Sequence, residues 1–177
     1  MTYPKSPDDA ERIAKLRSLG ILDSSADENF DRIVRLCCKI FDVEISTVSM
    51  VDEERQWFKA VEGFGVCETD REASFCNHTI LGDEIFEVPD ALADPQFATN
   101  PLVTGPPGIR YYAGAPIRYD EFRLGALCLI DPSPRPPMGQ TQREILSGLA
   151  TIVEREIRTQ RILRESVSFL TGFSDIG

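Results

Sequence analysis

The stretch IRYYAGAPIRYDEFRLGALCLID, residues 109–131, decides the fold of this chain. Its two parts, residues 109–119 and 123–131, are rich in apolar and aromatic side chains and are joined across the short turn YDEF. Two such runs on either side of a tight connection predict two antiparallel strands. We therefore expect these strands to be neighbours in the centre of the fold.

The alternation of side chains indicates what covers these two strands. Successive residues of a strand point to opposite faces of the sheet. In the first strand Arg110, Tyr112 and Gly114 share one face, and Ile109, Tyr111, Ala113 and Ala115 share the other. In the second strand Leu124, Ala126, Cys128 and Ile130 oppose Gly125, Leu127 and Leu129. Both faces are apolar, so we expect helices on one face and irregular segments on the other.

Three more runs predict strands, and two segments predict a cover for the sheet. Residues 44–52 and 56–63 read as a hairpin, and residues 85–90 as a further strand. Between them lies SFCNHTIL, residues 74–81, which we expect to form a short helix. Residues 91–108 form a long irregular crossover, and connections above about 15 residues are usually functional or disordered. We expect this crossover to be a lid.

Helical periodicity flanks the strands on both sides. Residues 6–22 predict a first helix with Ser6 or Asp8 as N-cap and Gly20 as its end. Residues 24–43 predict a second, starting from a capping box of Ser25 and Glu28. Its apolar stripe consists of Phe30, Ile33, Val34, Cys37, Ile40 and Phe41. The unpaired Cys37 is expected to be a core residue.

A third helix is expected from residue 140 to about residue 164, after the proline-rich elbow of residues 131–139. Its apolar stripe consists of Ile145, Leu146, Leu149, Ile152, Val153 and Ile157. Charged residues dominate beyond residue 154, so the first half should cover the sheet and the second half should leave the body. A projecting helix of this kind is suited to pair with a copy of itself, which predicts a homodimer. The division is then a helix at 1–22, a core at 23–138 and a signalling or dimerisation helix with its tail at 139–177.

Composition limits the partners. The chain has 177 residues, 42% of them hydrophobic, which suits one domain. With 19 basic and 29 acidic side chains the formal charge is −10, which disfavours nucleic acid and anionic membrane surfaces. No stretch approaches the roughly 20 apolar residues of a membrane span, and the start is unlike a signal peptide. We expect a cytoplasmic protein whose five cysteines are reduced thiols.

The order of these motifs resembles a GAF domain. The specific part runs from SFCNHTI through VPDALADPQFATNPLVTGPPGIRYYAGAPI to GALCLID, within a match over roughly residues 10–160. It is similar in particular to the bacterial subgroup that precedes histidine kinase or diguanylate cyclase modules. The resemblance implies an α+β fold, GAF/PAS-like, in which a central antiparallel sheet of five or six strands carries helices on one face. It also implies a loop-covered pocket for a small molecule on the other face.

Departures from better-defined members of the family bear on the ligand. No counterpart of the asparagine-lysine and phenylalanine-aspartate signature of cyclic-nucleotide-binding members is present, and Asn77 separates Cys76 from His78 where bilin-binding members place the two together. The cysteines Cys67, Cys76 and Cys128 do not map onto the motif of free methionine sulfoxide reductases. A single histidine is enough for an axial haem ligand, so haem stays among the candidate cofactors. Zinc needs more ligands than one segment supplies. The cofactor and the ligand are therefore not assigned, and no metal is expected.

The pocket implied by the resemblance should take its polar groups from three places. These are the short helix, the lid and the facing strand, and the expected ligand-binding residues are Cys76, His78, Asp90, Asp94, Asn100, Arg110 and Tyr112. Arg110 needs an anion, which is either a ligand or a salt bridge from Asp90 or Asp94. On a helix Cys76 and His78 point in different directions, so a local catalytic dyad is not expected.

The function predicted from these features is a non-catalytic sensory domain. A small molecule would settle the lid, and the terminal helices would pass its state to an output kinase or cyclase module in a two-component or cyclic-di-GMP pathway. The alternatives are a thiol-based redox enzyme or sensor that uses Cys67 or Cys76, and a dimerisation scaffold without a ligand.

Overall fold

A computed structural model of the chain describes the backbone of residues 3–172 and the side chains as far as residue 167. The helices are α1 (Asp9–Ser18), α2 (Glu28–Phe41), α3 (Cys76–Thr79), α4 (Pro101–Thr104), α5 (Gln140–Gly172) and the short 3₁₀ helix η1 (Arg71–Ala73). The strands are β1 (Ile45–Val51), β2 (Arg55–Glu62), β3 (Glu68–Asp70), β4 (Phe86–Val88), β5 (Tyr111–Tyr119) and β6 (Phe122–Asp131). The prediction for the tail beyond residue 172 lies outside the described residues.

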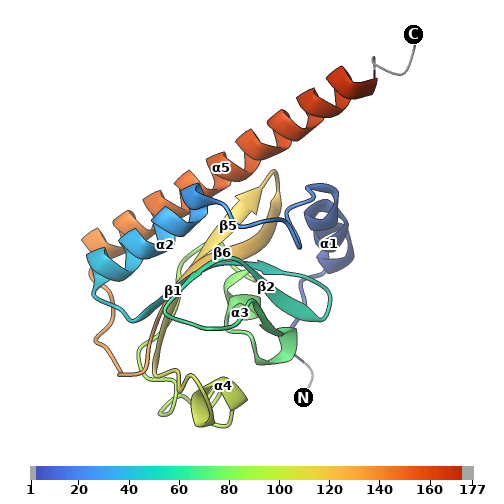
Figure 1. Ribbon diagram of the computed structural model, residues 1–177. Coiled ribbons are helices and arrows are strands. Elements are labelled where there is room, and N and C mark those ends of the chain that lie inside the picture. Colours follow the sequence, from blue (N-terminus) through green and yellow to red (C-terminus); the bar gives the residue numbers. More distant parts are fainter. Residues whose placement is uncertain (1–2, 173–177) are drawn as a thin grey trace.

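One antiparallel sheet of six strands organises the chain, in the order β3-β2-β1-β6-β5-β4. The predicted pair of strands, β5 and β6, lies beside β1 near its centre, and the short edge strand β3 is the one that sequence reasoning did not single out. Helices α2 and α5 lie side by side over one face, and α3 and α4 belong to the other (Figure 1). The expected α+β architecture is confirmed.

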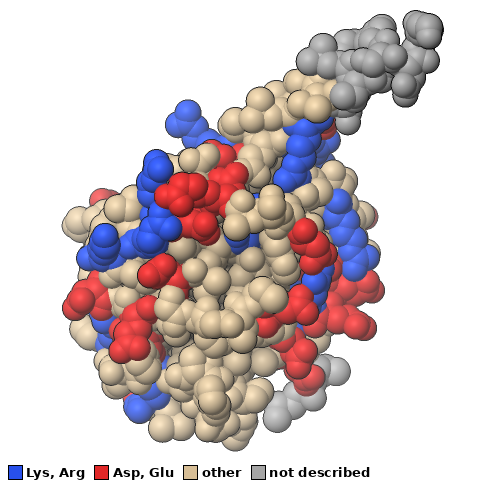
Figure 2. All heavy atoms as spheres, in the orientation of Figure 1, with Lys and Arg blue, Asp and Glu red and all other residues tan. Residues whose placement is uncertain are grey.

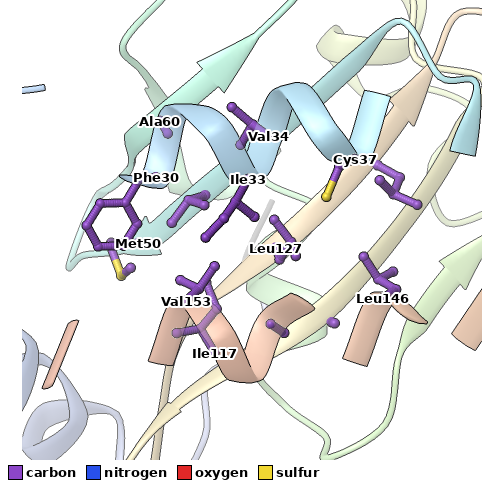
Figure 3. Packing of buried hydrophobic residues seen from close by; sticks show 14 of the residues in the cluster. Phe30, Ile33, Val34, Cys37, Met50, Ala60, Ile117, Leu127, Leu146 and Val153 are labelled. Carbon is purple, nitrogen blue, oxygen red and sulfur yellow. The ribbon is translucent and has the colours of Figure 1, made fainter. Parts of the chain in front are cut away.

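The face covered by helices holds the main hydrophobic core. Side chains of α2 and α5 meet those of β1, β5 and β6 there (Figure 3). On α5 the buried residues are Leu146, Ala150, Val153 and Ile157, which recur at helical spacing. Cys37 is buried in this core, as predicted, and so is Trp57 of β2.

The cap of α2 and the apolar stripes of α2 and α5 differ from prediction. The capping box is wrong, because α2 begins at Glu28 and the Asp27 carboxylate caps it by accepting from Asn29 N at 2.8 Å. Ile40 of α2 and Ile145 and Ile152 of α5 are exposed rather than part of the core stripe. They lie on the outer flank of each helix, which the neighbouring helix does not cover.

The two faces of β6 are assigned correctly except at Leu124. Ile117 pairs with Gly125 whereas Arg118 pairs with Arg123, so Leu124 is the extra residue of a β-bulge. A bulge reverses the alternation on one side of it. Leu124 therefore joins Leu127 and Leu129 in the core under the helices and not Ala126 and Cys128 on the opposite face.

Candidate functional site

The face of the sheet opposite the helices is covered by residues 71–108, and side chains fill the space between. Tyr112 of β5 and Cys128 of β6 pack there against Phe75, Ile80 and Phe97 of the covering segments. The Phe97 ring stacks on Phe75 at 4.3 Å between centroids, and Phe75 lies 5.1 Å from the Tyr112 ring. The chamber expected directly beneath the lid is thus occupied by the protein's own aromatic rings.

Polar atoms are buried at the centre of this face and form a cluster that we call the thiol–hydroxyl cluster: Cys76, Cys128, Tyr112, Thr79 and Ser49. The sulfur atoms of Cys76 and Cys128 are 3.0 Å apart, and the Tyr112 hydroxyl lies 3.4 Å from each. The same hydroxyl hydrogen-bonds the Thr79 hydroxyl at 2.7 Å. Hydrogen bonding of this kind is what allows polar groups to be buried at moderate cost.

A glycine makes room for this cluster. A Cβ on Gly114 would come within 2.2 Å of the Tyr112 hydroxyl oxygen and 2.6 Å of the Thr79 hydroxyl oxygen. Gly114 is the direct partner of Cys128 across β5 and β6. The absence of a side chain at residue 114 therefore lets the hydroxyl groups lie next to the two sulfur atoms.

The cluster shifts the acidity of its own members. Burial raises the pKa of the Cys76 thiol well above its usual value. Burial opposes a thiolate at Cys128 as well, but hydrogen bonds from Cys76, Tyr112, Thr47 and Ser49 lower the pKa of that thiol. The pKa of Tyr112 is raised, chiefly by burial. Between the two sulfur atoms, a negative charge is favoured on Cys128.

An open cavity of about 400 Å³ lies beside the lid rather than beneath it. Three parts of the chain line it: the N-terminal segment, residues 70–78 with η1 and part of α3, and residues 96–101 of the lid. The lining residues are Tyr3, Pro4, Asp70, Glu72, Ala73, His78, Gln96, Phe97, Thr99, Asn100 and Pro101. Two of the predicted ligand-binding residues, His78 and Asn100, are among them. The cavity has aromatic walls and acidic side chains at its rim.

His78 is held in the cavity wall as a neutral imidazole. Its Nδ1 accepts a hydrogen bond from Gln96 Nε2 at 3.1 Å, because an amide nitrogen can only donate. The ring stacks with Phe86 and meets Phe97 edge to face. Burial lowers the pKa of His78, and the nearby Asp94 carboxylate opposes this only in part. The side chain is therefore available as a neutral hydrogen-bonding group.

The other predicted residues of the lid shape its backbone. Asn100 accepts from Leu102 N at 2.8 Å, which caps α4, and donates from Nδ2 to the Ala73 carbonyl at 3.0 Å. Asp94 accepts from Gln96 N at 2.9 Å. These contacts fix the loop that carries Gln96 and Phe97 to the cavity.

Arg110 and Asp90 lie together, apart from the cavity lining. The guanidinium donates from Nε and Nη2 to the two carboxylate oxygens of Asp90, both at 2.8 Å. This bidentate bond lowers the pKa of Asp90 and raises that of Arg110. In this structure the anion beside Arg110 is the salt-bridge partner that the sequence offered as an alternative to a ligand.

Asn77 connects the cavity wall to the N-terminal segment. Its Oδ1 accepts from Arg71 Nε at 2.8 Å, and its Nδ2 donates to the Pro4 carbonyl at 2.8 Å. The Arg71 guanidinium also lies over the Tyr3 ring. Sequence reasoning missed Tyr3, Asp70 and Gln96 as cavity residues. Only the fold brings these segments to one place, and no spacing in the sequence marks them.

The described residues show neither a metal centre nor a membrane span. Among them no three histidine, cysteine, aspartate or glutamate side chains are placed to hold a metal ion. Within residues 3–172 no helix combines the length and the apolar character needed to cross a bilayer. All five cysteines lie in this range and are unpaired thiols.

Comparison with known sequences identifies relatives. The sequence model of the GAF domain matches residues 25–157. The cyclic di-GMP phosphodiesterase PA2567 of Pseudomonas aeruginosa is 42% identical over 161 residues, which cover 90% of this chain. The chain spans only 27% of the length of that relative.

Solved structures with the same fold have low sequence identity. The GAF domain of an Acinetobacter phosphoenolpyruvate-protein phosphotransferase has a TM-score of 0.62 at 17% identity, over 88% of this chain and 95% of that one. The free methionine-R-sulfoxide reductase of Neisseria meningitidis, solved with its substrate, has a TM-score of 0.63 at 16% identity, over 92% and 98% of the two chains. The blue-light-absorbing PixJ GAF domain of Thermosynechococcus elongatus has a TM-score of 0.63 at 13% identity, over 96% of this chain and 98% of that one. These similarities show the fold, and the match over residues 25–157 shows that the chain belongs to the GAF domain family.

Proposed function

We propose that this chain is a non-catalytic sensory domain that binds a small molecule in the cavity beside the lid. The observation that carries the proposal is the cavity itself, because three separate segments meet there and two of the predicted residues, His78 and Asn100, line it. Small-molecule sites are typically concave, with aromatic walls and a few polar groups. The cavity has this character.

The lining favours a neutral or cationic ligand. Asp70 lines the cavity, and none of the described residues that form its lining is a lysine or an arginine. Like charges repel, so an anionic ligand would meet an unfavourable field there. A face mostly free of charge surrounds α4, whereas both signs are scattered elsewhere (Figure 2). We expect a compact organic molecule whose apolar part contacts Phe97 and whose polar part reaches His78 or Asn100.

A thermal-shift screen with a matched pair of variants tests this. The probes are free amino acids, polyamines and nucleobases, with cyclic di-GMP as the anionic comparison. Thr99 lines the cavity and Thr104 does not, and both side chains are exposed. Thr99→Trp should abolish the rise in melting temperature that a bound probe causes, whereas Thr104→Trp should leave that rise intact. The proposal fails if no probe stabilises the wild type, or if the Thr99 variant responds as the wild type does.

A route from the lid segment to the long helix supports signalling. Glu87 of β4 lies four residues before the lid begins at residue 91. Its side chain is buried and accepts from the Tyr111 hydroxyl at 3.0 Å and from Met138 N at 2.7 Å. It also forms an ion pair with Arg143 in the first turns of α5. A displacement of β4 therefore reaches α5 directly. An output module joined to this domain is part of the proposal, in line with the longer phosphodiesterase relative.

Homodimerisation through α2 and α5 completes the proposal. Large apolar side chains are exposed on the outer side of both helices: Leu36 (42%), Ile40 (49%), Ile145 (40%) and Ile152 (50%). Further along α5, where the helix leaves the body (Figure 1), Ile162 and Leu163 are exposed too. Contiguous apolar surface on a soluble domain marks an interaction site. A second copy of this chain would cover it in a parallel helical pair.

A further inference from the structure

The cysteines of the thiol–hydroxyl cluster are placed for a reaction that the proposed function does not use. Cys76 is on α3 and Cys128 on β6, 52 residues apart in sequence, and their sulfur atoms are 3.0 Å apart. Both side chains are almost fully buried, at 2% and 0% exposure. A disulfide bond is about 2.05 Å long. The two sulfur atoms thus need to approach by only about 1 Å to become bonded.

The surroundings favour a nucleophilic sulfur on β6. The Tyr112 hydroxyl lies 3.4 Å from both sulfur atoms, whereas the Ser49 hydroxyl lies 3.8 Å from the Cys128 sulfur. Hydroxyl groups can donate to a thiolate, and the thiolate is the form that reacts with peroxides and disulfides. Of the remaining cysteines, Cys37 is enclosed in the main core, Cys38 is half-buried and Cys67 is exposed.

We propose that Cys76 and Cys128 form a redox-active pair that a peroxide converts to an intramolecular disulfide. The Cys128 sulfur attacks one peroxide oxygen and the O–O bond breaks, which releases hydroxide and leaves a sulfenic acid. The Cys76 sulfur then attacks the Cys128 sulfur, the S–S bond forms and the S–O bond breaks. With the two thiol protons the products are one disulfide and two waters, and two electrons pass from the thiols to the peroxide.

The bond would fix one wall of the cavity to the sheet. Cys76 and His78 both belong to α3, a helix of four residues, and His78 lines the cavity. Fastening α3 to β6 limits the positions that His78 can adopt. Both sulfur atoms are buried, so a local opening of the segments that cover them is required to admit the peroxide. Oxidation state and cavity occupancy are thereby expected to influence each other.

Thiol counting on the intact protein tests the pair. Wild-type protein is treated with hydrogen peroxide, denatured in N-ethylmaleimide and weighed as the intact chain. We expect two of the five thiols to escape alkylation, a monomer on a non-reducing gel, and a peptide map that joins Cys76 to Cys128. Dithiothreitol should restore all five thiols.

Matched variants separate this pair from the other thiols. Cys67→Ser, which removes the exposed thiol, should still lose two thiols on oxidation, whereas Cys76→Ser should lose none by disulfide formation. Circular dichroism of Cys76→Ser checks its fold, and the wild-type peptide map decides the question if that variant does not fold. The proposal is overturned if all five thiols alkylate after peroxide, if the linked peptides contain Cys37, Cys38 or Cys67, or if Cys76 and Cys128 end as sulfinic acids without a bond.

Discussion

Arg71 Nη2 lies 2.8 Å from Oδ1 of Asp9, and this buried ion pair joins the first helix to the wall of the cavity. The Arg71 side chain is fully buried, and a second bond from Nη1 reaches the other oxygen of Asp9 at 2.9 Å. Arg71 Nε also donates to Oδ1 of Asn77, and Asn77 directly precedes His78 in the sequence. The N-terminal helix is therefore connected to the residues that line the cavity by charge-assisted hydrogen bonds.

Asp9→Asn should destabilise the fold strongly. The change leaves two buried guanidinium groups, Arg12 and Arg71, without their carboxylate. Removal of one partner of a buried pair costs about 3–5 kcal/mol. Asp23→Asn, which removes the surface ion pair with Arg55, is the control, since an exposed pair contributes roughly 1 kcal/mol or less. Urea unfolding of the two variants measures both effects, and equal losses would contradict the role given to Asp9.

The same carboxylate predicts a pH dependence. Burial alone would raise the pKa of Asp9, but the bonds from Arg71 and Arg12 outweigh it and hold that pKa below its usual value. A depressed pKa gives stability that is present above the ordinary value of about 3.9 and is lost as the pH falls through the folded value. The difference in unfolding free energy between wild type and Asp9→Asn should therefore shrink below about pH 4. A constant difference down to acid pH would disprove this assignment.

His78 offers a second and separate titration. Its pKa is lowered by burial, so the unfolded chain takes up the proton first and stability declines as the pH drops below about 6.5. The chain has a single histidine, so its imidazole gives one NMR titration curve. We expect the midpoint below about 6.5. His78→Gln should remove this part of the pH dependence, and a midpoint above the ordinary value would count against a neutral His78.

Two glycines should respond in opposite ways to alanine. Gly114→Ala places a methyl group against the Tyr112 and Thr79 hydroxyls, and overpacking of this kind costs about 1–3 kcal/mol. Gly148 is exposed in α5 with open space around it. Gly148→Ala should stabilise the helix by about 1 kcal/mol. Thermal unfolding of the two variants shows whether each change raises or lowers the stability. Stabilisation by Gly114→Ala would mean that the thiol–hydroxyl cluster is loosely packed.

The apolar flank of α5 should control the oligomeric state. Ile152→Asp introduces a charge where a second copy would pack, and a buried unpaired charge is costly. We expect the dimer to dissociate without loss of the fold, as seen by sedimentation and circular dichroism. Val66 is also exposed and lies in the connection between β2 and β3, outside both helices. Val66→Asp should leave the dimer intact, and a wild-type monomer at high concentration would refute the dimer.

Most of the sheet could be predicted from residues close together in the sequence. The alternation in residues 109–115 gave the correct face for Tyr111 and Tyr112. It was wrong for Ile109, which precedes β5 and packs with Tyr112 rather than with Tyr111. It failed at Leu124 because a bulge is created by the register between two strands and not by either strand alone. The stripe of α2 was right for Phe30 and wrong for Ile40, because the position of the neighbouring helix decides which flank is covered.

The candidate site was less predictable than the fold. The segment around His78 was found because it contains the one histidine of the chain, and Asn100 because it lies in a long irregular crossover. Tyr3 and Asp70 carried no such signal. Their contribution depends on contacts between segments that are far apart in the sequence, such as Asn77 with the Pro4 carbonyl.

By itself the sequence determined the α+β class, the order of the longer strands and helices, and the family, because hydrophobic periodicity and motif order are properties of neighbouring residues. Only the tertiary structure decided that aromatic rings fill the space beneath the lid, that the cavity opens beside it, and that Cys76 meets Cys128. Those features arise from the packing of distant segments against each other, where the fit of volumes and the pairing of polar groups select one arrangement.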